Sequence, residues 1–104
     1  MKVDVTPLER MSVQEFANKH GLTMKVDERA TNYWPDARWY ARFDNFELKE
    51  GSCLVSTYGN GSTVDEAIAN YCKEISEKHG VINAYHVSRK EIYRIPLLHN
   101  QTVA

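Results

Sequence analysis

An apolar stripe between residues 64 and 75 is the clearest pattern in this 104-residue chain. Its side chains recur at every third or fourth position, which is the period of an amphipathic helix. The stripe consists of Val64, Ala67, Ile68, Tyr71, Cys72 and Ile75. Thr63 and Glu66 form a capping box that begins this helix, and the segment 78–80, which closes with a glycine, is expected to end it.

A shorter helix is predicted over residues 13–20 by the same period. Ser12 and Glu15 form its capping box, and Gly21 is expected to end it in the left-handed conformation. The two helical units therefore begin and end with similar residues. Either an internal duplication or the general preference of helix ends for these residues would produce this similarity.

Period-two alternation of apolar and polar residues predicts the strands. They span residues 22–27, 38–48, 53–58, 81–87 and 91–97, and residues 1–8 form either a short strand or an extended arm. Apolar positions after Asp44 and Asn45 fall out of phase with those before, so a bulge is expected there. Gly59 and Gly61 are expected to supply the positive φ angles of a sharp reversal. Pro96 places the last strand at a sheet edge or ends it.

These elements predict an α+β fold. An antiparallel sheet of about five to six strands, packed against two helices, would bury every apolar stripe. We expect a single two-layer domain over residues 1–97 and a loose C-terminal tail over residues 98–104.

Composition narrows the class of protein. A formal net charge of −1 gives no general attraction to nucleic acid or to anionic membranes. No stretch approaches the ~18 apolar residues of a membrane span, and no leader precedes a cleavage site. We therefore expect a cytoplasmic protein that does not bind membranes. In that reducing compartment, Cys53 and Cys72 are not expected to form a disulfide.

Few residues match a catalytic pattern. Asp36, Glu47 and Lys49 fit the loose signature of metal-dependent nucleases, in which an aspartate and a Glu-x-Lys surround a divalent ion. A strand over residues 38–48 would hold Asp36 and Glu47 far apart, so a nuclease is a remote alternative. The sequence has no zinc-ligand spacing, nucleophile elbow or phosphate-binding lysine. We expect neither enzymatic activity nor a metal or cofactor.

The longest predicted strand carries a candidate binding surface. Arg38, Tyr40 and Arg42 share one of its faces, beside a loop that bears Tyr33 and Trp34. Arginine next to aromatic rings is typical of protein-interface hot spots, and it can also stack on nucleic-acid bases. The alternative is that Tyr40 packs under a helix while both arginines pair with nearby acids.

A second basic patch surrounds the last predicted hairpin. It consists of His86, Arg89, Lys90 and Arg94. A plain solvated turn would have the same composition. His20 and His79 each precede the glycine of a helix end, where a partly positive imidazole is favoured.

Three resemblances involve the glycine-rich turn before the second helix. Double-stranded-RNA-binding domains have a similar turn, which this chain carries at Gly59-Asn60-Gly61-Ser62-Thr63 with Ala67. HicB-type antitoxins, which neutralise a small RNA-cleaving toxin, have a turn similar to Gly61-Ser62-Thr63-Val64-Asp65-Glu66-Ala67. The whole chain, especially residues 39–43, 58–63 and 66–68, resembles a group of small tailed-phage proteins, which commonly bind a host component.

These observations lead to one expected function and its alternatives. We expect a small, non-enzymatic, phage-encoded binding protein that recognises a bacterial host protein. A nucleic-acid-binding module, either antitoxin-like or similar to an RNA-binding domain, is the alternative. An exposed sheet edge or apolar face could also mediate a homodimer.

Overall fold

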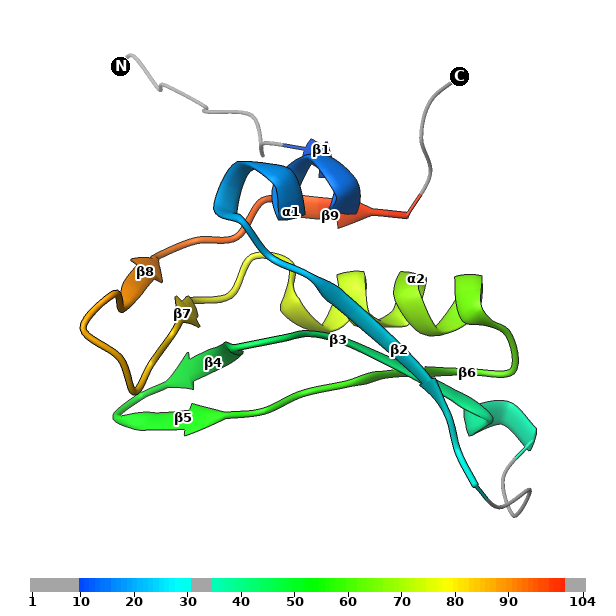
Figure 1. The fold of residues 1–104 in the computed structure, drawn as a ribbon. Coiled ribbons are helices and arrows are strands. Elements are labelled where there is room, and N and C mark those ends of the chain that lie inside the picture. Colours follow the sequence, from blue (N-terminus) through cyan, green and yellow to red (C-terminus); the bar gives the residue numbers. More distant parts are fainter. Residues whose placement is uncertain (1–9, 31–34, 101–104) are drawn as a thin grey trace, which may run out of the picture.

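The computed structural model of the chain describes residues 10–30 and 35–100 (Figure 1). The strand or arm expected over residues 1–8 lies outside the described residues, as do Tyr33 and Trp34. Within the described part the chain forms two α-helices and nine short strands, which confirms the α+β class. Figure 1 shows helix α2 over strands β3 and β6, and helix α1 beside the pair β1–β9.

The helices are α1 (Val13–His20) and α2 (Val64–Ile75), with a 3-10 turn η1 (Pro35–Ala37). The strands are β1 (Arg10–Ser12), β2 (Met24–Glu28), β3 (Trp39–Phe43), β4 (Phe46–Glu50), β5 (Cys53–Val55), β6 (Gly59–Gly61), β7 (Gly80–Ile82), β8 (Lys90–Ile92) and β9 (Leu97–His99). They pair in three sheets with the orders β2-β3-β6, β5-β4-β7-β8 and β1-β9. Among the strands of the described residues, β1 and β9 alone pair in parallel.

A break between β3 and β4 explains why the expected single sheet is divided. Ala41 pairs with Gly59, and Leu48 pairs with Val55. The chain therefore advances by seven residues from Ala41 to Leu48 but by only four from Val55 to Gly59. The difference of three residues is taken up around the turn at Asp44 and Asn45, where Asn45 has a φ of 55°. An irregularity was predicted at this point, but it is a two-residue turn that separates β3 from β4 and not a bulge within one strand. Beyond the turn, the second edge of β4 pairs with β7.

Both predicted N-caps form, but the carboxylates of the two capping boxes bond elsewhere: Glu15 accepts from the hydroxyl of Ser12, and Glu66 accepts from Ser62 in place of Thr63. The hydroxyl of Ser12 accepts a hydrogen bond from the amide of Glu15 at 3.1 Å, and Thr63 accepts one from the amide of Glu66 at 3.1 Å. Gly21 ends α1 with a φ of 65°. These contacts satisfy amides and carbonyls that helix ends leave without a partner.

The predicted end of α2 was wrong. This helix ends at Ile75, and Glu77, with a φ of 64°, takes the left-handed position that was expected of a glycine. The amide of Glu77 donates to the carbonyl of Ile95 at 2.8 Å, so pairing with the C-terminal segment draws the chain out of the helix. Gly80 lies instead in β7. The similarity of the two helical units therefore does not extend to their C-terminal ends.

The role expected of Gly59 and Gly61 was also wrong, because neither has a positive φ. Both are buried residues of β6, against which α2 packs closely. A Cβ on Gly59 would lie 2.2 Å from the carbonyl oxygen of Ala67, and one on Gly61 would lie 2.4 Å from the amide nitrogen of Ala67. These glycines are needed for the close approach of helix and strand.

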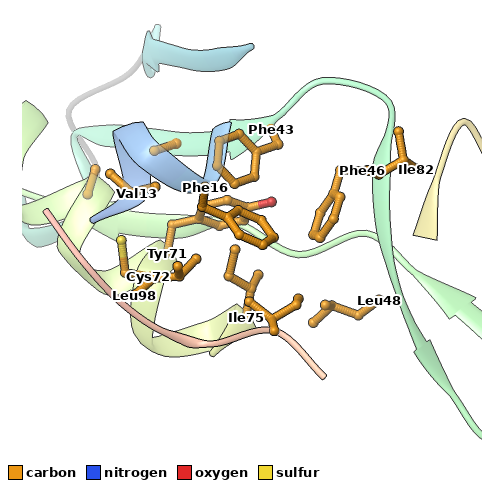
Figure 2. Close-up of a cluster of buried hydrophobic side chains, with 13 residues drawn as sticks. Val13, Phe16, Phe43, Phe46, Leu48, Tyr71, Cys72, Ile75, Ile82 and Leu98 are labelled. Atoms are coloured by element: carbon orange, nitrogen blue, oxygen red, sulfur yellow. The ribbon is translucent and has the colours of Figure 1, made fainter. Parts of the chain in front are cut away.

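The core lies between the two helices and the inner face of the sheets (Figure 2). The ring of Phe43 lies 6.0 Å from that of Phe16 in α1 and 5.5 Å from that of Tyr71 in α2. Phe46 joins the same group, with its ring 5.7 Å from that of Phe43. Burial raises the pKa of Tyr71 to about 12, so its hydroxyl stays neutral.

The C-terminal segment is more ordered than predicted. Strands β7 and β8 are shorter than the expected hairpin arms over residues 81–87 and 91–97, and Pro96 lies between β8 and a further strand, β9. Leu98 of β9 is buried, and its amide donates to the hydroxyl of Ser76 at 3.0 Å. The expectation of a loose tail from residue 98 was therefore wrong for residues 98–100, because β9 pairs with β1 and packs against α2.

Candidate functional site

The alternation of β3 defines an inner and an outer face of the β2-β3-β6 sheet. Ala41 and Phe43 are buried on the inner face, where α1 and α2 both contribute rings to the core. The outer face carries Arg38, Tyr40 and Arg42, and of these Arg38 is exposed while the other two are half-buried. Tyr40 therefore does not pack under a helix, which had been the alternative arrangement.

Tyr40 lies at the centre of this outer face. On one side it pairs with Asp27 of β2, and on the other with Asn60 of β6. The guanidinium of Arg29 lies over its ring, 4.8 Å from the centroid. The ring of Tyr58 meets that of Tyr40 edge-on at 5.9 Å. Two rings and a cation are thus gathered on one open sheet surface.

Arg29 is held in place by two hydrogen bonds. Its Nε donates to the carbonyl oxygen of Ala37 at 2.8 Å, and its Nη2 donates to Oδ1 of Asn60. Arg29, Tyr40 and Tyr58 line an open groove of about 290 Å³. Because these contacts fix the guanidinium in advance, little side-chain entropy is lost when a ligand enters the groove.

Sequence reasoning missed Arg29 and Tyr58. Arg29 sits one residue beyond β2, where its amide donates to the carbonyl of Arg38 at 2.8 Å and extends the ladder. The pairing register that places Arg29 opposite Arg38 is a long-range property. Period-two spacing from Lys25 and Asp27 was the available signal, since it puts Arg29 on their face of the strand.

The arginines of the predicted surface differ in their partners. Nη2 of Arg38 lies 2.9 Å from Oε1 of Glu28, so this arginine does pair with an acid. Among residues 10–30 and 35–100, Arg42 forms no ion pair. The alternative in which both arginines are neutralised therefore holds for Arg38 alone. Tyr33 and Trp34, the loop residues of the same predicted surface, lie outside the described residues.

The residues of the second basic patch do not act together, because their side chains contact different partners. Arg94 pairs with Glu77 at 3.2 Å, and Arg89 lies 3.8 Å from Glu91. Nζ of Lys90 lies 3.2 Å from Nδ1 of His20 in α1, whereas His86 is exposed on the turn between β7 and β8. These four side chains do not converge on one point.

Lys90 also affects the charge of His20. Burial is the main cause that lowers the pKa of His20 from 6.5, and the positive charges of Lys90 and Lys19 lower it further. His20 is the last residue of α1, as expected, but burial and the two neighbouring lysines disfavour its charged form.

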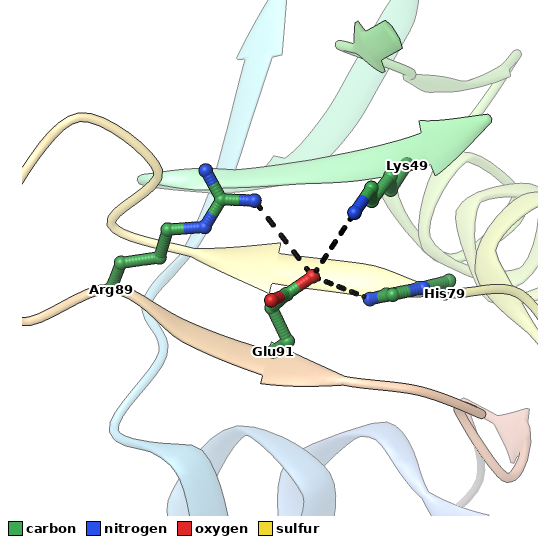
Figure 3. Close-up of polar contacts among 4 residues, drawn as sticks. All are labelled: Lys49, His79, Arg89 and Glu91. Carbon is green, nitrogen blue, oxygen red and sulfur yellow. Dashed lines mark hydrogen bonds and ion pairs between the residues drawn. The ribbon is translucent and has the colours of Figure 1, made fainter. Parts of the chain in front are cut away.

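A polar cluster joins β4, β7 and β8 around Glu91 (Figure 3). Oε1 of Glu91 lies 3.0 Å from Nε2 of His79. The same oxygen lies 3.6 Å from Nζ of Lys49 and 3.8 Å from a guanidinium nitrogen of Arg89. Burial opposes ionisation of Glu91, but the charges of Lys49 and Arg89, with the bond to His79, outweigh it and lower its pKa.

We expect the Glu91→Gln variant to lose less stability than the wild type when the pH is lowered. Because the pKa of Glu91 is lower when folded, its ionised form stabilises the protein above the ordinary value of 4.5. That contribution is lost as the pH falls from 4.5 through the folded pKa. Urea midpoints of wild type and variant should differ at neutral pH and converge at acid pH. Glu74→Gln, at an exposed position of α2, is the matched control and should show no such convergence.

The nuclease pattern is not assembled into a metal site. Asp36 lies in η1 and Glu47 in β4, with all of β3 between them, while Lys49 contacts Glu91. In the part of the chain that the structure describes, no group of three or more His, Cys, Asp or Glu could hold a metal ion.

The two cysteines occur as free thiols. Cys53 is exposed at the start of β5, whereas Cys72 is buried on α2. Burial raises the pKa of Cys72 to about 11, which keeps its thiol protonated at neutral pH.

Fold and site together define an α+β protein with an open, cationic and aromatic sheet face. Compared with protein-family models, curated proteins and solved structures, the chain gives no significant match. In the described ranges, neither helix has the length and apolar character needed to cross a membrane.

Proposed function

We propose that this chain is a small non-enzymatic binding protein that recognises a protein partner through its outer sheet face. The observation that carries the proposal is the grouping of Arg29, Tyr40 and Tyr58 around an open groove on the side of the sheet away from both helices. Tyrosine and arginine dominate the energetics of protein interfaces, since each combines a large apolar surface with a polar end.

The groove is already organised before a partner binds. Arg29 is fixed by Ala37 and Asn60, and the Tyr40 ring is held between the guanidinium and Tyr58. Preorganised rings lose little conformational entropy on association, so a compact surface of this kind can support specific binding. The resemblance to small tailed-phage proteins suggests a bacterial host protein as the partner.

Affinity capture from bacterial lysate tests this proposal. We expect a stoichiometric protein that is lost when Tyr40→Ala is combined with Arg42→Ala, because the variant removes a central ring and a cation from the face. The matched control combines Lys73→Ala with Glu74→Ala on the exposed side of α2 and should retain the protein. Recovery of chaperones alone, or equal recovery by both variants, would contradict the proposal.

A nucleic-acid-binding module is the second candidate. The guanidinium of Arg29 over the Tyr40 ring, next to an exposed Tyr58, is an arrangement on which bases can also stack. This candidate predicts binding of oligouridine or oligothymidine that weakens steeply with added salt, because neutralised phosphates release counterions. Absence of a mobility shift with either oligonucleotide at low salt would remove it.

A further inference from the structure

Two pairs of like charges lie directly across from each other on the outer face. Arg29 stands opposite Arg38, and Lys25 stands opposite Arg42. Like charges that face each other across an antiparallel pair destabilise it. The two pairs belong to the same two strands, so their surroundings can be compared within one sheet.

Both cations of the first pair have partners within the chain, and one of these partners is a carboxylate. Arg38 forms an ion pair with Glu28 at 2.9 Å, and Arg29 donates hydrogen bonds to Ala37 and Asn60. Arg29 also lies over the ring of Tyr40, which attracts its positive charge. Every cation at this end of the sheet therefore has a partner within the chain.

The second pair has no such partners. Across the described ranges, neither Lys25 nor Arg42 takes part in an ion pair or a side-chain hydrogen bond. Asp27, which lies two residues after Lys25 on the same strand face, forms no ion pair there either. Arg42 is half-buried as a residue, and its guanidinium has no ion-pair partner in the described ranges.

We propose that Lys25 and Arg42 receive carboxylate side chains from an acidic segment of the protein partner, beside apolar contact with Tyr40 and Tyr58. This inference rests on the proposed function and specifies its partner. Charge complementarity carries it, because the protein supplies partners for one cation pair, a carboxylate for Arg38 among them, and supplies none for the other within the described ranges.

A local carboxylate fits this end of the sheet better than a phosphate backbone does. A strand of nucleic acid that ran between the two cation pairs would have to pass Asp27, which lies between them on β2. A single carboxylate that reaches only Lys25 and Arg42 does not have to cross Asp27.

Titration of the full ¹⁵N-labelled chain with an acetylated hexaglutamate peptide tests the inference. We expect amide shifts centred on Lys25 and Arg42, and none with hexaglutamine. Lys25→Gln combined with Arg42→Gln should weaken hexaglutamate binding about tenfold, whereas Arg38→Gln should change it little, because Arg38 already has Glu28. Equal binding by the two variants, or stronger binding of oligothymidine at the same amides, would overturn it.

A stability measurement gives a second readout that needs no partner. Arg42→Gln should raise the urea midpoint at low salt, since it removes an uncompensated repulsion, and added salt should reduce the gain. Arg38→Gln should not raise it, because that change breaks the pair with Glu28. A lower midpoint for Arg42→Gln would contradict the inference. If lysate capture depends on Tyr40 while hexaglutamate does not bind, the inference fails and the proposed function stands.

Discussion

Replacing Phe43 with alanine should destabilise the fold by about 3–5 kcal/mol. Phe43 is fully buried, and its ring lies within contact range of three others, those of Phe16, Phe46 and Tyr71 (Figure 2). Truncation would remove apolar burial and leave a cavity where both helices meet the sheet. Single domains are stable by only about 5–15 kcal/mol, so urea unfolding followed by circular dichroism should show a much lower midpoint.

The matched variant is Phe43→Leu, which retains most of the buried volume and should cost about 1–2 kcal/mol. The difference in unfolding free energy between the two variants measures the cost of the cavity and of the lost ring contacts. If Phe43→Ala lowered the stability no more than Phe43→Leu, the packing of α1 and α2 on the same side of β3 would be contradicted.

Gly59→Ala should have the second largest effect, a loss of about 3 kcal/mol. The new Cβ would lie 2.2 Å from both the carbonyl oxygen of Ala67 and the amide nitrogen of Tyr71. These are backbone atoms of a helix, so a side-chain rotation cannot relieve the overlap, and α2 must move away from β6. Thermal and urea unfolding both measure the loss.

Gly51→Ala is the control for this prediction. Gly51 has a φ of 62°, and nothing lies within 4 Å of the position its Cβ would take. Its replacement should cost about 1 kcal/mol through backbone strain alone. A Gly59→Ala variant that was no less stable than Gly51→Ala would contradict the close packing of α2 on β6.

The same contact links the core to the outer face. Asn60 follows Gly59 in β6, and its side chain accepts the hydrogen bond that fixes Arg29 over Tyr40. The backbone carbonyl of Asn60 accepts a hydrogen bond from the side-chain amide (Nδ2) of Asn70 in α2. The distance between α2 and β6 therefore also sets the position of the groove.

Several features of this protein follow from local sequence. The caps at Ser12 and Thr63 form because the hydroxyl of a cap residue lies within reach of the backbone amide three residues later at a helix start. The outward direction of Arg38, Tyr40 and Arg42 follows from the two-residue period of a strand. Local chain geometry alone is enough for these predictions.

Other features depend on contacts between distant segments. The position of Arg29 depends on the register of β2 against β3, and that of Tyr58 on the return of the chain beside β3. The cluster around Glu91 requires β4, β7 and β8 to pair in one order. No local pattern marks these pairings, since many registers satisfy the same alternation.

By itself, therefore, the sequence determined the kinds of element, both helix starts and the face on which the candidate binding residues lie. Tertiary structure decided the division into three sheets, the early end of α2 near Glu77, and the role of Gly59 in close packing. It also decided which cations have partners within the described chain, giving Arg38 an ion pair and leaving Lys25 and Arg42 without one. The physical reason is that caps and periods depend on neighbours along the chain, whereas pairing depends on the packing energy of the whole domain.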